Sequence, residues 1–352
     1  MSKQLTEGNE AIVLGALLGG ATHFFGYPIT PASEIAHAAA YFFPASGRKF
    51  LQAESEISAI NMIYGASASG ARAMTASSGP GISLMAEGIS YLAGAELPAV
   101  IVNIQRAGPG LGYIWPEQSD YNCVVKGGGH GSYKNIVFAP ASVQEMCDFT
   151  YRAFDIADRF RMTVFILSDA YIGQMMEPIN LPVTVKHNSH KPWAVYGDRE
   201  SRKNLITSIY MDQQVLSALN HRLQEKYRTI EQELVEFEES DIKDAEVLFV
   251  AYGISARICS SALMKLRETG IKAGLIRLKT LFPFPRKQLH DLAPTLRACI
   301  VMELCDGQMA EDVERAVEGQ CPVIRYNWFG GIIPSIHEIV ERVNADISGT
   351  LK

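Results

Sequence analysis

Several features are absent from this sequence, and each absence excludes a broad class of protein. No cluster of Lys and Arg is present, and the formal net charge is -6, which argues against a nucleic-acid-binding protein. No run of about 18 uninterrupted apolar residues exists, so no membrane span is expected. The apolar run Ala11–Ala21 follows Glu7 and Glu10, where a signal peptide would carry positive charge. We therefore expect a soluble, cytoplasmic protein with no nucleic-acid partner.

Cysteine is scarce and scattered. There is no CxxC motif and no Cys/His pair at the spacing of metal ligands, so we expect no metal site, iron–sulfur cluster or structural zinc in this chain. Reduced thiols are the ordinary state of cytoplasmic cysteines, because disulfides are rare in that compartment. The six cysteines are Cys123, Cys147, Cys259, Cys299, Cys305 and Cys321.

Familiar nucleotide and nucleophile motifs are also absent. No glycine-rich turn forms GxGxxG or GxxxxGK[ST] after a predicted strand. Gly253-Ile254-Ser255 lacks the last glycine of GxSxG, so Ser255 is predicted to cap a helix, as is Asn9 near the start of the chain. His130, in a glycine-rich loop, could approach a phosphate or acyl group, but a turn histidine is the simpler interpretation.

What is present predicts an α/β protein with two doubly wound open-sheet domains. At 352 residues the chain is too long for one ordinary domain. Apolar strand patterns alternate with helical patterns over residues 1–187 and again over 246–352. Residues 188–245 are polar and carry an apolar seam at spacings of three and four, which predicts a helical linker. This linker helix either packs on its own chain or contacts another subunit.

One carboxylate in the stretch 52–81 is out of place. On a helical wheel, Glu56 projects from the middle of the apolar arc, whereas Glu54 falls on the polar side. An isolated ionised carboxylate among apolar groups costs several kcal/mol, so Glu56 needs a cationic partner, a proton or a ligand. A helix carboxylate satisfied by a nearby Arg or backbone group is the plain alternative.

Two loops carry further candidate residues. In Tyr27-Pro28-Ile29-Thr30-Pro31 the two prolines fix the backbone and force the residues before them out of the helical region, so Thr30 lies in a rigid loop. Arg106 follows the apolar strand 99–104, at the place where open α/β sheets bind ligands. The alternatives are an ordinary turn for Thr30 and a surface ion pair for Arg106.

These segments together resemble a known family over nearly the whole chain. That family is the alpha subunits of 2-oxoacid:ferredoxin oxidoreductases, and the likeness extends to subunits named for branched-chain 2-oxoacids such as 2-ketoisovalerate. The matching segments are GNEA (8–11), YPITPAS (27–33), ESEISAINM (54–62), GARAMTASSGPG (70–81), QRAGP (105–109), KPW (191–193), LFPFP (281–285) and VMELCDGQMAEDVERAV (301–317).

The resemblance implies thiamine diphosphate as cofactor, with this chain supplying the half-site for its aminopyrimidine ring. The first domain would be a pyrimidine-binding domain and the second a transketolase C-terminal-like domain. By resemblance, Glu56 hydrogen-bonds ring nitrogen N1′, where a carboxylate in an apolar pocket can share a proton and favour the imino tautomer. The other implied cofactor contacts are Pro28, Ile29, Ser78 and Gly79.

By the same resemblance, Thr30 and Arg106 contact the carboxylate of the 2-oxoacid, a role suited to the donor fork of arginine. The implied reaction is oxidative decarboxylation of the 2-oxoacid to acyl-coenzyme A and CO2, with coenzyme A as a substrate and ferredoxin reduced. A branched-chain substrate such as 2-oxoisovalerate is expected. Alternatives are a 2-oxoglutarate enzyme, the beta subunit of a lipoyl-linked dehydrogenase, and a non-catalytic assembly subunit.

One further absence implies partners. No GDG is followed some 25 to 30 residues later by Asn, the metal-diphosphate motif of thiamine enzymes. We therefore expect activity only with a beta subunit that holds Mg²⁺ and the diphosphate. An iron–sulfur subunit of ferredoxin type, a gamma subunit and ferredoxin itself complete the expected partners.

Overall fold

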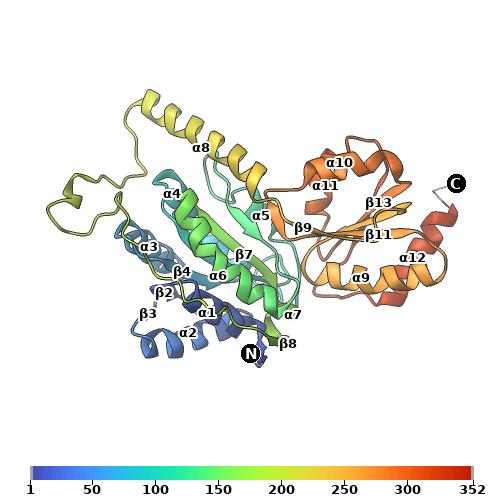
Figure 1. Cartoon of the computed structure of the whole chain (residues 1–352), viewed down its shortest axis with the longest axis horizontal. Helices are drawn as coiled ribbons and strands as arrows, with labels where there is room; N and C mark the ends of the chain where they lie inside the picture. The colour runs from blue at the N-terminus through green and yellow to red at the C-terminus, as the bar shows by residue number, and fades with distance from the viewer. Residues whose placement is uncertain (1–2, 350–352) are drawn as a thin grey trace.

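The computed structural model describes residues 3–349 and contains two large open sheets (Figure 1). Within these residues the first sheet has seven strands, all paired in parallel except for the edge pair β12/β6. Its strands are, in spatial order, β12 (Thr280–Phe282), β6 (Ile136–Phe138), β7 (Thr163–Asp169), β5 (Ala99–Gln105), β4 (Ala73–Ser77), β2 (His23–Gly26) and β3 (Lys49–Gln52).

Helices follow most of these strands, as the alternating pattern predicts. Two of them begin at serine caps: Ser55 accepts a hydrogen bond from the backbone N–H of Ser58, and Ser142 accepts one from Glu145. The short strands β1 (Gln4–Glu7) and β8 (Met176–Ile179) form a separate antiparallel pair. The helices are α1 (Gly8–Leu18), α2 (Ser33–Ala45), α3 (Glu56–Ala68), α4 (Gly79–Gly94), α5 (Tyr121–Val125), α6 (Val143–Phe160) and α7 (Ala170–Gln174).

The second sheet lies at the opposite end of the molecule, with α9 and α12 on one side and α10 and α11 on the other (Figure 1). Three of its strand pairs are parallel, and β9 adds an antiparallel edge. Its strands, in spatial order, are β14 (Val323–Asn327), β13 (Ala298–Glu303), β10 (Val247–Ala251), β11 (Ala273–Leu278) and β9 (Phe237–Ser240). Its helices are α9 (Gly253–Glu268), α10 (Arg286–Leu292), η2 (Ala293–Thr295), α11 (Gln308–Val317) and α12 (Ile336–Gly349).

The connecting segment packs on its own chain. It contains a short turn of 3₁₀ helix, η1 (Ser201–Lys203), and the long helix α8 (Gln213–Glu233). The apolar seam of α8 is buried, as the spacing predicts, at Leu219, Leu223, Tyr227 and Ile230. On the polar side, Arg222 and Lys226 both form ion pairs with Glu96 at 2.6 Å. The seam of α8 therefore packs on its own chain, and the role of α8 as an inter-domain linker remains a proposal.

Two strands join a sheet outside the predicted part of the chain to which they belong. Strand β9 comes from the predicted linker and joins the second sheet, whereas β12 comes from the predicted second domain and joins the first. The division at residues 187 and 245 remains a proposal, in which each part lends an edge strand to a neighbour. Among residues 3–349, no helix has the length and apolar character needed to cross a membrane.

Two predicted helix caps are wrong. Asn9 lies inside α1 and is buried, and its amide donates to the Pro31 carbonyl at 2.9 Å and to Glu34 at 3.1 Å. Ser255 lies inside α9, where its buried hydroxyl donates to Oε1 of Gln118 at 2.6 Å. In both cases the side chain binds a distant segment rather than the start of its own helix.

Candidate functional site

The predicted site residues gather along one edge of the first sheet. Strands β3, β2, β4 and β5 are neighbours and run parallel, so their carboxyl ends lie at the same edge. Each is followed directly by predicted residues: β3 by Glu56, β2 by the Pro28–Thr30 loop, β4 by Ser78 and Gly79, and β5 by Arg106. This edge is where open α/β sheets bind ligands.

Glu56 is the first residue of α3, and only 5% of it is exposed, whereas Glu54 is exposed. The separation of the two carboxylates by the helical wheel is therefore confirmed. Within residues 3–349, the Glu56 carboxylate has no hydrogen bond and no ion pair. The plain alternative of a carboxylate satisfied by a neighbouring Arg is not what these residues show. A carboxylate that is nearly enclosed and has no partner in the chain can accept a hydrogen bond from a ligand that carries a donor group.

Helix α4 packs closely on this carboxylate through a glycine. A Cβ placed on Gly81 would lie 2.0 Å from Oγ of Ser77 and 2.5 Å from Oε1 of Glu56. Real Cβ atoms do not approach other atoms so closely, so only glycine at this position leaves Glu56 where it lies. The glycines of the GPG turn thus have a packing role beside the candidate catalytic group.

We expect Gly81→Ala to lower the free energy of unfolding by about 1–3 kcal/mol, because the added methyl group must displace Glu56 or Ser77. The matched control is Gly65→Ala in α3, where a Cβ meets no atom within 4 Å. That change should raise stability by about 0.5–1 kcal/mol, since alanine restricts the unfolded chain. Denaturant unfolding curves measure both, and equal stability of the two variants would contradict the close packing of Gly81.

A hydroxyl without a partner lies next to this glycine turn. Ser78 precedes α4, yet its side chain makes no capping hydrogen bond, and its Oγ is buried with no hydrogen-bond partner among the described residues. Its neighbour Gly79 approaches the carboxylate of Asp120, which would lie 3.0 Å from an added Cβ. An unsatisfied buried hydroxyl and a close backbone approach are both features of a ligand-binding edge.

The two predicted substrate-binding residues, Thr30 and Arg106, are in direct contact. The guanidinium of Arg106 donates to the backbone carbonyls of Thr30 and Leu111, each at 2.8 Å, and its Nε has no hydrogen-bond partner among the described residues. No ion pair of Arg106 is found within residues 3–349, so the alternative of a surface ion pair is not supported. Arg106 thus fixes the loop that carries Thr30 and keeps donors for an anion.

A cleft of about 490 Å³ opens beside Arg106, between the two sheets. One wall consists of Gly79, Pro80 and the loop that follows β5, and the other comes from the turn between β13 and α11. That turn contributes Cys305 and Asp306, and the first residue of α11 contributes Gln308. None of the three was predicted as a site residue. The only sequence signal for them was their place in the VMELCDGQ segment.

Asp120 and Glu117 organise the walls of this cleft. Asp120 accepts a hydrogen bond from Asn103 at 2.9 Å, and burial raises the pKa of Asp120, with the charge of Glu117 adding to the rise. Glu117 accepts from the backbone N–H groups of Gly108 and Gly330, both at 2.8 Å. It therefore holds the loop after β5 against the second α/β unit. Neither carboxylate was predicted as a site residue.

A second pocket, of about 570 Å³, adjoins Thr30. Its lining is mainly apolar, and it contains one acidic side chain, Glu34, but no Lys, Arg or His. The apolar walls are Pro31, Ile114, Trp115, Pro116, Ala170 and Met175. Because Arg106 donates a hydrogen bond to the Thr30 carbonyl, the cleft beside Arg106 and this apolar pocket adjoin the same loop.

The remaining predictions concern His130 and metals. His130 is exposed, its carbonyl accepts a hydrogen bond from Ser90, and its ring packs edge-on against Tyr91. It lines neither the cleft beside Arg106 nor the pocket beside Thr30. Over residues 3–349, no group of three or more His, Cys, Asp or Glu side chains could hold a metal ion.

The structure is thus an α/β protein with two open sheets, and one edge of the first sheet carries a candidate ligand site that contains Glu56 and Arg106. Residues 14–241 match the family described as "Pyruvate flavodoxin/ferredoxin oxidoreductase, thiamine diP-bdg". Residues 245–339 match "Pyruvate:ferredoxin oxidoreductase core domain II". The chain belongs to this family of 2-oxoacid:ferredoxin oxidoreductase subunits, as its motifs predict.

Curated relatives match along the whole chain. "Ketoisovalerate oxidoreductase subunit VorB" of Methanothermobacter marburgensis is 53% identical over 350 residues, covering 99% of each chain. The protein of that name from Methanothermobacter thermautotrophicus is 54% identical, covering 97% of each chain. "2-oxoglutarate synthase subunit KorA" of Archaeoglobus fulgidus is 40% identical, covering 97% of this chain and 99% of the relative.

Solved structures share the fold. A 2-oxoglutarate:ferredoxin oxidoreductase from Magnetococcus marinus, with 2-oxoglutarate, coenzyme A and succinyl-CoA bound, superposes with a TM-score of 0.88 at 26% identity. The match covers 98% of this chain and 65% of that one, so this chain spans less than two thirds of its length. An inactive β4 tetramer of split gene transketolase matches at a TM-score of 0.59 and 14% identity, over 97% of this chain and 96% of the other, which shows the fold alone.

Proposed function

We propose that this chain is the alpha-type subunit of a thiamine-dependent, ferredoxin-reducing enzyme that oxidises branched-chain 2-oxoacids such as 2-oxoisovalerate to acyl-coenzyme A and CO2. The observation that carries the proposal is Glu56, which is buried without a partner at the sheet edge where Thr30 and Arg106 also lie. Family membership supplies the reaction class, and this geometry supplies a role for each residue.

The residues at the sheet edge fit the aminopyrimidine ring of thiamine diphosphate. Glu56 would accept a hydrogen bond from N1′, and the unsatisfied hydroxyl of Ser78 follows β4, which β2 separates from β3. Pro28, Ile29 and Gly79 would complete this half-site from the neighbouring loops. When bound, the cofactor supplies the electron sink for decarboxylation. Glu56 holds a proton at N1′, and its apolar surroundings strengthen that hydrogen bond.

The loops that carry Thr30 and Arg106 would bind the substrate. Arg106 offers its unpaired Nε and its remaining donors to the carboxylate of the 2-oxoacid. Thr30 is exposed next to the apolar pocket and supplies a hydroxyl at its mouth. The carboxylate of the substrate is therefore held at Arg106, and its side chain extends toward the pocket.

The composition of that pocket favours a branched-chain side chain. A distal carboxylate, as in 2-oxoglutarate, would need a cationic partner, because an unpaired charge in an apolar pocket is costly. The described lining offers no cation and one carboxylate, Glu34. The names of the relatives at 53% and 54% identity point to the same substrate class. Initial rates with 2-oxoisovalerate should therefore exceed those with 2-oxoglutarate at equal concentration, and the reverse order would overturn the substrate assignment.

A substitution in the pocket tests the same point. Ile114 is half exposed at its wall, and we expect Ile114→Lys to lower kcat/KM for 2-oxoisovalerate about tenfold, because contact with about two methyl groups is lost. The same change should raise kcat/KM for 2-oxoglutarate. Met264→Lys on α9 is the control, since Met264 is exposed and far from the pocket along the fold. An unchanged ratio of the two substrates in Ile114→Lys would contradict the role of this pocket.

The proposal requires further subunits. The chain would share thiamine diphosphate with a beta subunit that carries the diphosphate-binding motif and Mg²⁺, and would pass electrons to an iron–sulfur subunit, with a gamma subunit in the assembly and ferredoxin as acceptor. Relatives named as subunits support a multi-subunit enzyme. Affinity purification of the tagged chain from its native cell tests this composition, and recovery of an active chain without partners would contradict it.

A further inference from the structure

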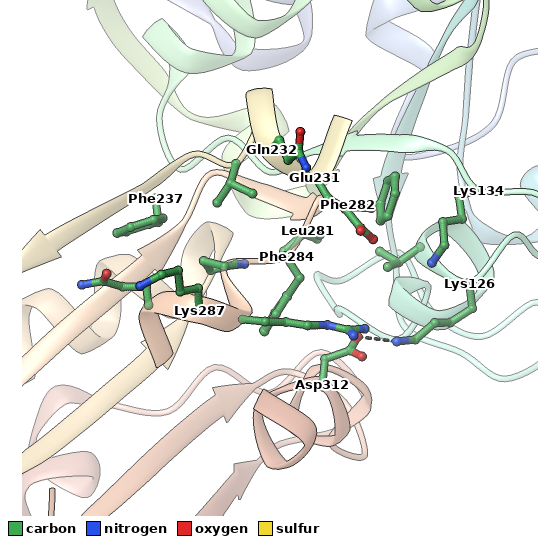
Figure 2. Close-up of a pocket in the computed structure, with 15 residues that line it drawn as sticks. Lys126, Lys134, Glu231, Gln232, Phe237, Leu281, Phe282, Phe284, Lys287 and Asp312 are labelled. Atoms are coloured by element: carbon green, nitrogen blue, oxygen red, sulfur yellow. Dashed lines mark hydrogen bonds and ion pairs between the residues drawn. The ribbon is translucent and has the colours of Figure 1, made fainter. Parts of the chain in front are cut away.

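A further cleft, of about 530 Å³, is shown in Figure 2. Four segments that are distant in sequence meet there: the region from the end of α5 toward β6, the carboxyl end of α8 with the start of β9, the turn from β12 into α10, and α11. None of the predicted cofactor or substrate residues lines it. A concave space of this size suits a small molecule, since ligand pockets span about 300–1,000 Å³.

Positive charge converges on this cleft. Four cationic side chains line it, against two carboxylates, a net formal charge of plus two (4 - 2). The carboxylates are Asp312, which pairs with Lys126, and Glu231, which forms no ion pair among residues 3–349. The cations are Lys126, Lys134, Arg286 and Lys287.

Two of the cations lack a counter-ion. Lys287 pairs with Asp291 on its own helix, but over residues 3–349 neither the ammonium of Lys134 nor the guanidinium of Arg286 has a hydrogen bond or an ion pair. Figure 2 shows Lys126 and Lys134 reaching into the cleft from the same segment. The four cations outnumber the two carboxylates, so part of their mutual repulsion is not offset, and a bound anion would relieve it.

Lys134 is the more constrained of the two. Its ammonium lies over the Phe282 ring, 4.7 Å from the centroid, and the side chain is half-buried. Burial lowers the pKa of Lys134, the nearby Glu231 opposes that shift, and Arg286 and Lys126 add to it. Lys134 is thus partly desolvated, which strengthens a hydrogen bond to any anion that enters.

The walls add an apolar, aromatic surface. Phe237 and Phe284 are partly buried, and Phe282 and Leu281 are buried at the base of the cleft. Aromatic walls favour flat rings, which stack on them. Opposite them, Oδ1 of Asp312 is buried and has no hydrogen-bond partner among the described residues, so it remains available to a donor group on a ligand.

We propose that this cleft binds a small phosphorylated ligand that carries a planar ring, the chemical class of adenine nucleotides. Lys134 and Arg286 take the phosphoryl oxygens, a role for which the fork of arginine and the point charge of lysine are both suited. The ring lies against Phe282 and Phe284, where Asp312 can accept from an amino or hydroxyl group. Inorganic phosphate shares the first part of this chemistry and lacks the second.

The site connects physically to the cleft beside Arg106. Asp312 accepts a hydrogen bond from the hydroxyl of Tyr121 at 2.7 Å, and Tyr121 follows Asp120, which lines the cleft beside Arg106. A ligand that moves Asp312 would therefore alter its hydrogen bond with Tyr121, the residue next to Asp120.

The test is isothermal titration of the complete chain, in the complex isolated with its partners, using ADP, inorganic phosphate and adenosine as separate probes. We expect ADP to bind more tightly than phosphate and adenosine not to bind. The double variant Lys134→Gln/Arg286→Gln should bind ADP at least about tenfold more weakly, because charge-assisted hydrogen bonds are lost. The control is Lys265→Gln, whose ammonium pairs with Glu268 on the exposed face of α9 and should leave binding unchanged.

Each outcome decides the proposal. Equal ADP affinity in the wild type and the double variant, with both folded by circular dichroism, would overturn it, as would an absence of binding by both ADP and phosphate at millimolar concentration. Equal affinity for phosphate and ADP would overturn the aromatic part and leave a phosphate site. As a measurement independent of the variants, photo-cross-linking with 8-azido-ADP should label the peptides around Lys134 and Phe282–Arg286, and labelling elsewhere alone would contradict the site.

Discussion

Replacing Glu56 by Gln is expected to lower the rate of ferredoxin reduction by about 10²–10⁴-fold, the usual contribution of a positioned proton-transfer group. Gln has the same shape, so α3, the contact with Gly81 and the assembly of the complex should persist. The amide cannot hold a proton at N1′ as a carboxylate does. Steady-state rates with saturating 2-oxoisovalerate, coenzyme A and thiamine diphosphate measure the effect, and gel filtration checks the assembly.

The chain itself provides the matched control. Glu54 lies two residues away and is exposed, so Glu54→Gln changes the same net charge without touching the site. It should retain full activity. Retention of activity in both variants would favour the alternative of a non-catalytic assembly subunit. Electron transfer to lipoamide in place of ferredoxin by the wild type would favour a lipoyl-linked dehydrogenase.

Arg106→Ala is expected to lower kcat/KM for the 2-oxoacid by about 10²–10⁴-fold, because two hydrogen bonds to a charged carboxylate are lost. The loss should fall mainly on KM if Arg106 holds the carboxylate equally in the ground state and the transition state. Arg106→Lys keeps the charge without the fork and should give an intermediate loss. Initial rates over a range of substrate concentration separate KM from kcat.

A purely structural role of Arg106, in which it only holds the loop that carries Thr30, can be distinguished from substrate binding. Both variants lose hydrogen bonds to the carbonyls of Thr30 and Leu111, so a merely structural arginine would lower stability and kcat together. A change in kcat/KM of less than threefold in Arg106→Ala would remove Arg106 from substrate binding. A loss confined to kcat would assign it to holding the Thr30 loop instead.

Much of the fold follows from sequence because local patterns determine it. The strand at residues 99–104 is apolar except for Asn103 and becomes the buried β5, and the seam of α8 recurs at helical spacing. The edge strands β9 and β12 could not be predicted. Each is short and is stabilised by pairing with a strand distant in sequence, which leaves no local signal.

The site likewise contains features that follow from local sequence patterns and others that depend on tertiary packing. The wheel separates Glu56 from Glu54 because burial of a helix face follows a local pattern, although the next apolar residue of the same helix, Ile57, is half exposed. The contact of Gly81 with Glu56 and the bridge from Glu117 to Gly330 depend on tertiary packing. Asn9 and Ser255 show the same effect, since long-range partners replaced the capping roles that their residue types favour.

Hydrogen–deuterium exchange at C2 of the thiazolium ring of bound thiamine diphosphate tests the role of Glu56 most directly, because it reports proton transfer without needing substrate, coenzyme A or ferredoxin. Quenched-flow NMR on the assembled complex gives the rate for the wild type, Glu54→Gln and Glu56→Gln. We expect exchange in Glu56→Gln to be at least about a hundredfold slower, with the cofactor still bound and Glu54→Gln unchanged. Equal exchange rates in all three proteins would contradict the assignment of Glu56 to the cofactor.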